Sequence, residues 1–277
     1  MTRNLTNYHS HCSLCDGRAP MEDFVREAVR RGFTSYGISS HAPLPFPAVW
    51  TLDRGDVTAY LSEIERLKCS YAGRIELYAG MEIDYLDERN NPASDYFRQL
   101  PLDYRIGSVH LMHADDGGIV DIDTSPERFA EMLSERFGGD LRRLATAYFD
   151  KQIRMVEAGG FDFVGHVDKI SYNAECCEPG ITSRDWYRDK VRECFERIAA
   201  RGLMVEINTK KYSACGVFFP NREHFGLLRE LRVNSDAHRP ELIDDGRHEA
   251  MAALREAGIR EVIERVGNRW VPVEIVL

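Results

Sequence analysis

The sequence predicts an α/β fold in which parallel strands are joined by crossover helices and close into a barrel. Short apolar runs alternate with amphipathic segments along most of the chain, and this alternation is typical of parallel strands with crossover helices. The apolar runs also end on a histidine or a polar residue that could act at a shared site. We find no linker, low-complexity tract or internal repeat, so we expect a single domain over residues 1–277.

The first half of the chain contains three predicted strands and two predicted helices. LTNY at 5–8, FTSYGISSH at 33–41 and RIELYAGMEIDY at 74–85 are the strand-like runs. Between the first two, the apolar residues from Met21 to Val29 recur at helical spacing, and Gly32 provides a C-terminal stop. Asp56 is a candidate N-cap for a helix that carries apolar residues from Val57 to Leu67.

The second half repeats the alternation. Helical segments are predicted near 126–137, 140–158, 183–201, 221–230 and 247–257. The strand-like runs are DYRIGSVHL, FDFVGHV, LMVEINT and LRVNSDAH, which begin at 103, 161, 203 and 231.

Polar side chains gather at the C-terminal ends of these runs. In a closed parallel barrel the carboxyl ends of all strands meet at one rim, where barrel enzymes assemble their active sites. An open doubly wound sheet collects ligands only near its switch point, so contributions from about seven strands favour a barrel. The residues at these ends are His9, His11, His41, Glu82, His110, His166, Asn208, Asp236 and His238.

Composition excludes several classes of protein. A net charge of −9 argues against a nucleic-acid partner, because such proteins display basic patches. No apolar run reaches the ~18 residues of a membrane span, and the polar N-terminus lacks a secretory signal, so we expect a cytoplasmic protein with no membrane partner. The seven cysteines are too scattered for a disulfide framework. Cys12 and Cys15 have zinc-knuckle spacing, but reduced thiols are the better interpretation.

Two pairs of candidate ligands with i, i+2 spacing lie near opposite ends of the chain. One is the His-x-His pair of His9 and His11, and the other is the Asp-x-His pair of Asp236 and His238. Residues i and i+2 of an extended segment share a face, and paired imidazoles gain little from packing. A lone histidine after an apolar run is usually bound to a backbone carbonyl, but six in equivalent positions indicate a metal site. His113, His224 and His248 are expected instead to be solvated, structural or exposed.

The carboxylates support the metal interpretation. Glu82 lies between Met81 and Ile83 on a buried run, where a carboxylate needs a partner. Asp84 is an alternative ligand or could orient one, and Asp16 either binds metal or begins a turn with Gly17. Imidazole and carboxylate ligands without thiolate suit zinc, iron(II) or manganese. Nine candidate ligands exceed the needs of a simple binuclear site, so two or three ions are expected.

The set of motifs resembles the polymerase and histidinol phosphatase (PHP) family. The resemblance rests on His9-x-His11 with Asp16, SSHAPLP, GMEIDY, GSVHL, GHVD and NSDAH, which span residues 7–238. It implies a distorted barrel of seven β/α units with three divalent ions. His9, His11, Glu82 and Asp236 would hold one ion, Glu82, His110 and His166 the second, and Asp16, His41 and His238 the third.

Within that family, SSHAPLPF, DIDTSPERF and VEINTKKY resemble the histidinol-phosphate phosphatases of histidine biosynthesis. The resemblance implies hydrolysis of a small phosphate monoester by a hydroxide that bridges two ions. Asp16 or His41 would assist proton transfer to the leaving alkoxide. Phosphate is often bound by an arginine near VEINT, where this chain has lysines. The substrate-binding candidates are Lys169, Asn208, Lys210 and Lys211.

Two alternatives stay open at this point. Relatives that share such a site act on nucleotides or nucleic acids, and a non-catalytic metal-binding regulatory domain would carry the same ligands. The sequence does not reveal the oligomeric state.

Overall fold

A computed structural model describes residues 5–277 and confirms an α/β protein with parallel sheets. One sheet has the order β1-β2-β3 and the other has the order β10-β9-β8-β5-β4. Every strand pair within these two sheets is parallel. The first sheet contains β1 (Thr6–Asn7), β2 (Ser35–Ile38) and β3 (Glu76–Ala79). The second contains β4 (Glu82–Asp84), β5 (Ile106–Ser108), β8 (Phe163–Val164), β9 (Met204–Asn208) and β10 (Leu231–Asn234).

The predicted strand at 74–85 is in fact two strands that belong to different sheets. The chain leaves β3 at Ala79 and enters β4 at Glu82. Gly80 lies at this crossing, where an added Cβ would come within 2.2 Å of Cζ of the Tyr104 ring. A side chain would therefore displace Tyr104, whose hydroxyl donates to the carbonyl of Tyr8 at 2.7 Å.

The two sheets are linked at both of their junctions. At one junction Glu82 bridges to His41, and its amide donates to the carbonyl of Ser40 at 3.1 Å. At the other junction Ser10 bridges to Ala237, and the amide of His11 donates to the carbonyl of Ala237 at 2.9 Å. Both junctions lie beside predicted site residues.

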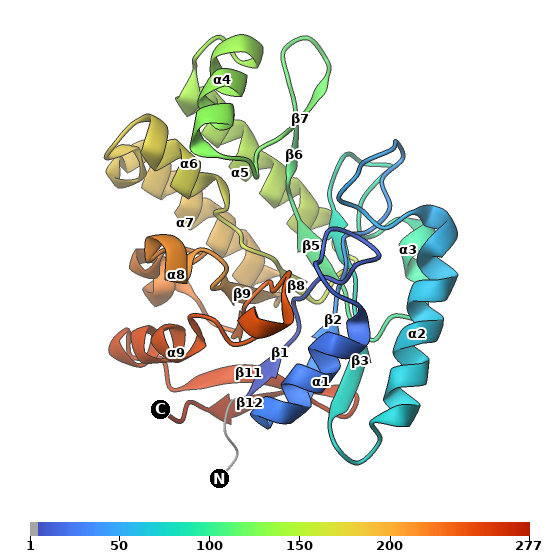
Figure 1. The fold of residues 1–277 in the computed structure, drawn as a ribbon. Helices are drawn as coiled ribbons and strands as arrows, with labels where there is room; N and C mark the ends of the chain where they lie inside the picture. The colour runs from blue at the N-terminus through green and yellow to red at the C-terminus, as the bar shows by residue number, and fades with distance from the viewer. Residues whose placement is uncertain (1–4) are drawn as a thin grey trace.

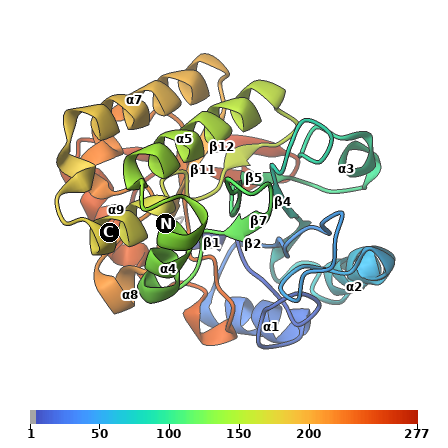
Figure 2. The same cartoon turned by 90° about the horizontal axis from the view of Figure 1, so that it is seen from above.

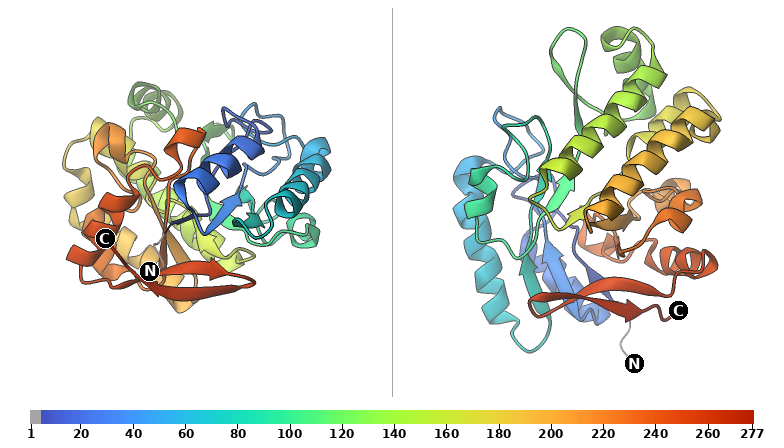
Figure 3. Two further views of the ribbon diagram at one scale, coloured as in Figure 1. Left: turned by 60° about the horizontal axis from the view of Figure 1, so that its bottom comes forward. Right: turned by 180° about the vertical axis from the view of Figure 1, so that it is seen from behind.

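The helices lie outside the parallel sheets (Figures 1 and 2). α1 buries Met21, Phe24, Val25 and Ala28 in one hydrophobic cluster with residues of β2 and β3, as an amphipathic helix on a sheet does. α5 and α7 pack on each other and appear side by side from behind (Figure 3, right). The helices are α1 (Met21–Arg31), α2 (Val57–Ser70), α3 (Asp95–Gln99), α4 (Pro126–Arg136), α5 (Leu141–Ala158), α6 (Ile170–Cys177), α7 (Asp185–Ala200), α8 (Tyr212–Cys215) and α9 (Arg247–Glu256).

Helix ends follow local sequence signals with two exceptions. Gly32 ends α1 with φ of 80°, as predicted, and Asp140 caps α5 by accepting from the amide of Arg143. Asp56 precedes α2, but its side chain makes no capping hydrogen bond. The helix predicted near 221–230 is a shorter 3₁₀ segment, Arg222–Leu227. Further 3₁₀ segments are Arg54–Asp56, Ile181–Ser183 and Pro240–Leu242.

Two antiparallel hairpins were not predicted. β6 (Leu111–His113) and β7 (Ile119–Asp121) form one, and β11 (Glu261–Val266) and β12 (Arg269–Glu274) form the other. The second hairpin lies across the lower end of the molecule (Figure 3, left). There Trp270 covers the buried guanidinium of Arg232, whose Cζ lies 3.8 Å from the ring centroid.

Among residues 5–277, no helix has both the length and the apolar character needed to cross a bilayer.

Candidate metal centre

The structure brings together the nine predicted metal ligands, of which all but Asp16 follow or lie on parallel strands. Five overlapping groups place their nitrogen and oxygen atoms within 4.8 Å of one another. The groups are His11, Asp16, His41 and His238; His9, His166 and Asp236; His9, His11 and Glu82; His41, Asp84 and His110; and Glu82, His110 and His166.

Glu82 lies at the centre of the cluster and is fully buried. Its Oε2 atom faces His9 Nε2 at 3.1 Å and His41 Nδ1 at 3.0 Å. Its Oε1 atom faces His166 Nε2 at 2.8 Å and His110 Nε2 at 3.5 Å. Each carboxylate oxygen therefore points to a different subset of imidazoles, which is the arrangement that a carboxylate bridging two cations requires.

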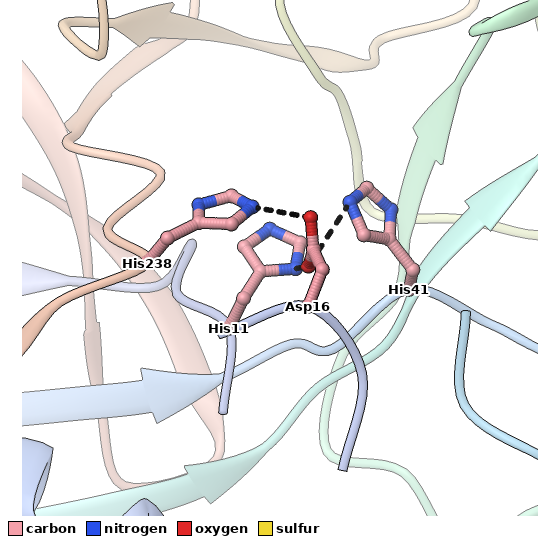
Figure 4. Close-up of side chains that lie close together, drawn as sticks. All are labelled: His11, Asp16, His41 and His238. Atoms are coloured by element: carbon pink, nitrogen blue, oxygen red, sulfur yellow. Dashed lines mark hydrogen bonds and ion pairs between the residues drawn. The ribbon is translucent and has the colours of Figure 1, made fainter. Parts of the chain in front are cut away.

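Asp16 forms a second centre with three histidines (Figure 4). His238 Nε2 lies 3.1 Å from Asp16 Oδ2, while His41 Nε2 and His11 Nδ1 each lie 3.9 Å from Asp16 Oδ1. Asp16 is half-buried, so this part of the cluster is nearer to solvent than Glu82.

Several buried atoms in the cluster have no hydrogen-bond partner among the described residues, although they lie close together. Buried polar atoms are normally hydrogen-bonded, whereas these atoms lie 3.0 to 3.9 Å from oppositely charged partners without hydrogen-bond geometry. The donor set is therefore available to divalent cations. The unpartnered atoms are His9 Nε2, His11 Nε2, His41 Nδ1, Asp16 Oδ1 and Glu82 Oε2.

Electrostatics in the cluster favour bound cations. Burial would raise the pKa of Glu82 and of Asp236, but the surrounding histidines, and for Asp236 also Lys210, hold both pKa values well below the usual range. Burial likewise opposes a charge on His110, yet Asp84 and Glu82 raise its pKa to about 10. Neighbouring carboxylates also raise the pKa of His9, so without other cations His9 and His110 supply positive charge as protons. A divalent ion among the same atoms can replace those protons.

A layer of carboxylates orients the histidines from behind. Glu206 accepts from His9 Nδ1 at 2.7 Å and from the backbone amide of His166 at 3.0 Å. Asp84 contacts His110 Nδ1 at 3.1 Å and accepts from its amide at 2.8 Å. Such partners fix the ring orientation and leave the opposite nitrogen free for a metal.

Backbone strain occurs at two of the predicted ligands. His166 has φ of 24° and Asp236 has φ of 50°, and they are the non-glycine residues with positive φ in the described chain. L-residues avoid this region unless the surroundings hold them there, and such residues concentrate at functional sites. The hydrogen bond from the His166 amide to Glu206 helps to hold the first of them.

A small cavity opens onto the cluster. Its volume is about 160 Å³, and it is lined by Asp16, His41, Trp50, His110, Asp121, Asp123 and Lys210. Of the predicted catalytic residues, both Asp16 and His41 line this cavity.

The four predicted substrate-binding residues occupy different places. Lys210 lines the cavity, with its Nζ 3.4 Å from Asp236 Oδ2. Lys169 is buried and forms an ion pair with Asp123 at 3.0 Å. The amide group of Asn208 donates to Glu206 and Asp236. Lys211 points elsewhere, with its Nζ 5.1 Å from the centroid of the Tyr172 ring.

The comparison with protein families agrees with this geometry. A sequence model described as PHP domain matches residues 6–210, which is well over half of the chain. The chain belongs to the PHP domain family.

Proteins similar to this PHP protein are named for one activity. "Probable histidinol-phosphatase" of Schizosaccharomyces pombe is 26% identical over 91% of this chain and 86% of that protein. "Histidinol-phosphatase" of Bacillus subtilis is 23% identical over 83% of this chain and 92% of that protein. The solved histidinol phosphate phosphatase of Lactococcus lactis, complexed with zinc, L-histidinol and phosphate, has a TM-score of 0.72 at 18% identity. That similarity covers 98% of this chain and 100% of that chain.

Sequence reasoning missed several residues of this PHP site. Glu206 lies two residues before Asn208 on the same strand, and that i, i+2 spacing was an available signal. Asp121 and Asp123 lie in DIDTSPERF, which carries the family resemblance, but no role was predicted for either of them. Trp50 lies in a segment without strand-end periodicity, so its place beside the cluster depends on tertiary structure. His113 is exposed at the end of β6, and His248 is exposed on α9. His224 is buried in its 3₁₀ segment and is structural rather than exposed.

Proposed function

We propose that this PHP protein is a metal-dependent phosphomonoester hydrolase that converts L-histidinol phosphate and water to L-histidinol and phosphate. The observation that carries the proposal is the clustering of nine imidazole and carboxylate side chains beside a small cavity, which Asp16, His41 and His110 of that cluster line together with Lys210. Similarity over most of the length of both chains to proteins named histidinol-phosphatase supports the choice of substrate. The cavity beside the cluster has a volume of about 160 Å³.

For the fold, we propose that residues 1–277 are one domain, a distorted barrel of seven strands. Its support is the pair of bridges that link the two parallel sheets, Ser10 with Ala237 and His41 with Glu82. With β3 and β4 counted as one position, the hydrogen-bonded order passes through seven parallel strands and returns to β1. The ligands then share the rim at the carboxyl ends of the strands.

For the metal ligands, we propose three sites with the grouping that the family resemblance implies. The buried unpartnered atoms support this assignment, and the overlapping groups allow Glu82 to serve two ions. Zinc is favoured among zinc, iron and manganese because the Lactococcus lactis relative was solved with zinc. The first site is His9, His11, Glu82 and Asp236; the second is Glu82, His110 and His166; the third is Asp16, His41 and His238.

Divalent ions bound by such ligands lower the pKa of water and neutralise charge on phosphoryl oxygens. The chain itself contributes Lys210, whose ammonium faces the cavity as a point charge for a phosphate oxygen. We assign proton transfer to the leaving alkoxide to Asp16 or His41, and their place in the lining of the same cavity supports this assignment. A cytoplasmic location and the absence of a nucleic-acid partner remain predictions from the sequence.

The test is phosphate release from L-histidinol phosphate by protein loaded separately with zinc, manganese or iron(II). We expect turnover that a chelator abolishes and metal restores, and little activity from Glu82→Gln. Single-stranded DNA serves as the competing substrate. Faster release of nucleotides than of phosphate would favour the nuclease alternative, and a metal-loaded protein inactive on every ester would favour a binding domain.

A further inference from the structure

The cavity beside the metal cluster has a second wall that the proposed hydrolysis does not use. Asp16, His41 and His110 form the wall of candidate metal ligands, and Lys210 lies with them. The remaining lining residues are Trp50, Asp121 and Asp123. An aromatic ring and two acids are not groups that bind a phosphate dianion, so this wall faces another part of the substrate.

Of the two acids, Asp123 is already neutralised. Its Oδ2 atom pairs with the buried Nζ of Lys169 at 3.0 Å. Burial would raise the pKa of Asp123, but the charges of Lys169 and Lys210 hold it below the usual range. A cationic ligand would therefore have to compete with Lys169 at this position.

Asp121 has no such partner. Its Oδ1 atom accepts from the backbone amide of Asp123 at 2.7 Å, and no lysine, arginine or histidine of the described residues lies within ion-pair distance of it. Burial raises the pKa of Asp121 to about 6, and Asp123 and Asp84 add to this effect while His110 opposes it. A carboxylate in such a place is stabilised by any cation that enters the cavity.

Trp50 supplies the apolar part of the wall. Its ring packs edge-on against His41, at 4.8 Å between centroids, and against His110, at 5.8 Å. These contacts hold the half-buried indole at the edge of the candidate metal centre. A flat heteroaromatic ring can pack on it while a phosphate group reaches the cluster.

We propose that Asp121 and Trp50 select the alcohol part of the substrate, with Asp121 binding a primary ammonium group and Trp50 packing on an aromatic ring. The inference rests on the proposed function and names the residues that would distinguish an aromatic amino-alcohol phosphate from other esters. Asp121 is then a specificity-determining residue and takes no part in the hydrolysis of the ester bond.

The experiment compares Asp121→Asn with Asp116→Asn on three esters. The asparagine side chain of the first variant keeps an oxygen that can accept from the Asp123 amide. Asp116 is a matched control because it accepts from the amide two residues later, Gly118, at 2.9 Å in the same hairpin but at the exposed tip. The esters are L-histidinol phosphate, its analogue without the amino group, 3-(imidazol-4-yl)propyl phosphate, and L-alaninol phosphate, which has the amine without the ring.

For Asp121→Asn, we expect kcat/KM to fall about 10- to 100-fold for both amine-containing esters, the range for a charge-assisted hydrogen bond, and to change little for the analogue without the amine. Asp116→Asn should match the wild type on all three. An equal loss on all three esters would overturn the inference, because it would indicate proton transfer to the leaving group or a structural effect. If the wild type releases no phosphate from L-histidinol phosphate, the proposed function fails and the inference fails with it.

The aromatic contact is tested with Trp50→Ala and Trp50→Phe. Alanine should lower kcat/KM for the two imidazole-containing esters and spare L-alaninol phosphate, and phenylalanine should recover most of the loss. Metal content measured for both variants separates this effect from disturbance of His41 and His110. Loss of activity on L-alaninol phosphate equal to that on the imidazole esters, with metal content unchanged, would contradict the role of Trp50.

Discussion

Replacement of Glu206 by glutamine should weaken metal binding without changing a proposed ligand. Glu206 is fully buried and accepts four hydrogen bonds, from His9 Nδ1 at 2.7 Å, the His166 amide at 3.0 Å, Asn234 Nδ2 at 3.0 Å and Asn208 Nδ2 at 3.2 Å. Glutamine has the same shape, but its amide group faces two of these donors with hydrogens of its own.

The size of the effect follows from these contacts. Loss of two hydrogen bonds to a buried charge, at roughly 1.5 kcal/mol each, lowers the free energy of unfolding by about 3 kcal/mol. Burial would raise the pKa of Glu206, but the neighbouring His9 lowers it, so the wild-type residue is a carboxylate that increases the basicity of His9. Loss of such a partner typically weakens metal affinity ~10- to 100-fold.

Competition with a chromophoric chelator measures the zinc affinity of each variant, and denaturant unfolding of metal-free protein measures stability. Asp162→Asn is a matched control, because Asp162 accepts from the Arg105 amide at 2.8 Å and from Trp270 Nε1 at 3.1 Å, away from the cluster. It should lower stability and leave zinc affinity unchanged. The reasoning is refuted if the zinc affinity of Glu206→Gln is within threefold of the wild-type affinity. It is also refuted if Asp162→Asn lowers the zinc affinity as much as Glu206→Gln does.

Three further predictions concern metal content, phosphate binding and acid stability. Glu82→Gln should lose more than one ion per chain in elemental analysis, because its two oxygens face different imidazoles; loss of a single ion would contradict a bridging role. Lys210→Ala should lower kcat/KM for phosphate esters about tenfold or more, while Lys211→Ala should have little effect, since Lys210 lines the cavity and Lys211 lies on Tyr172. Burial, with a smaller contribution from Arg188, lowers the pKa of His224 to about 4. The unfolded chain therefore binds the proton first, and about 3 kcal/mol of stability present above pH 6.5 is lost as pH falls towards 4. Unfolding of His224→Asn should lack this dependence, and identical pH profiles of the two proteins would refute the assignment.

The sequence by itself was sufficient to predict the parallel α/β class. Apolar runs and amphipathic helices are local patterns, and the polar residues that follow the runs mark one rim of a parallel fold. Eight of the nine candidate ligands were therefore predictable from their position, and Asp16 was predicted from its place after the His9-x-His11 pair. The sequence did not predict the break between β3 and β4. The run at 74–85 has continuous strand character, but Tyr104 packs against Gly80 and the chain changes sheets there.

Only the tertiary structure decided which polar residues support or surround the cluster. Glu206 and Asp121 look alike in the sequence as acids within apolar segments, yet one orients His9 and the other faces the cavity without a cationic partner. Lys210 and Lys211 are adjacent and chemically identical, but their side chains point in different directions. Lys210 reaches Asp236, whereas Lys211 lies over the Tyr172 ring. The physical reason is that periodicity reports which face of an element is buried, whereas the partners on that face come from distant segments.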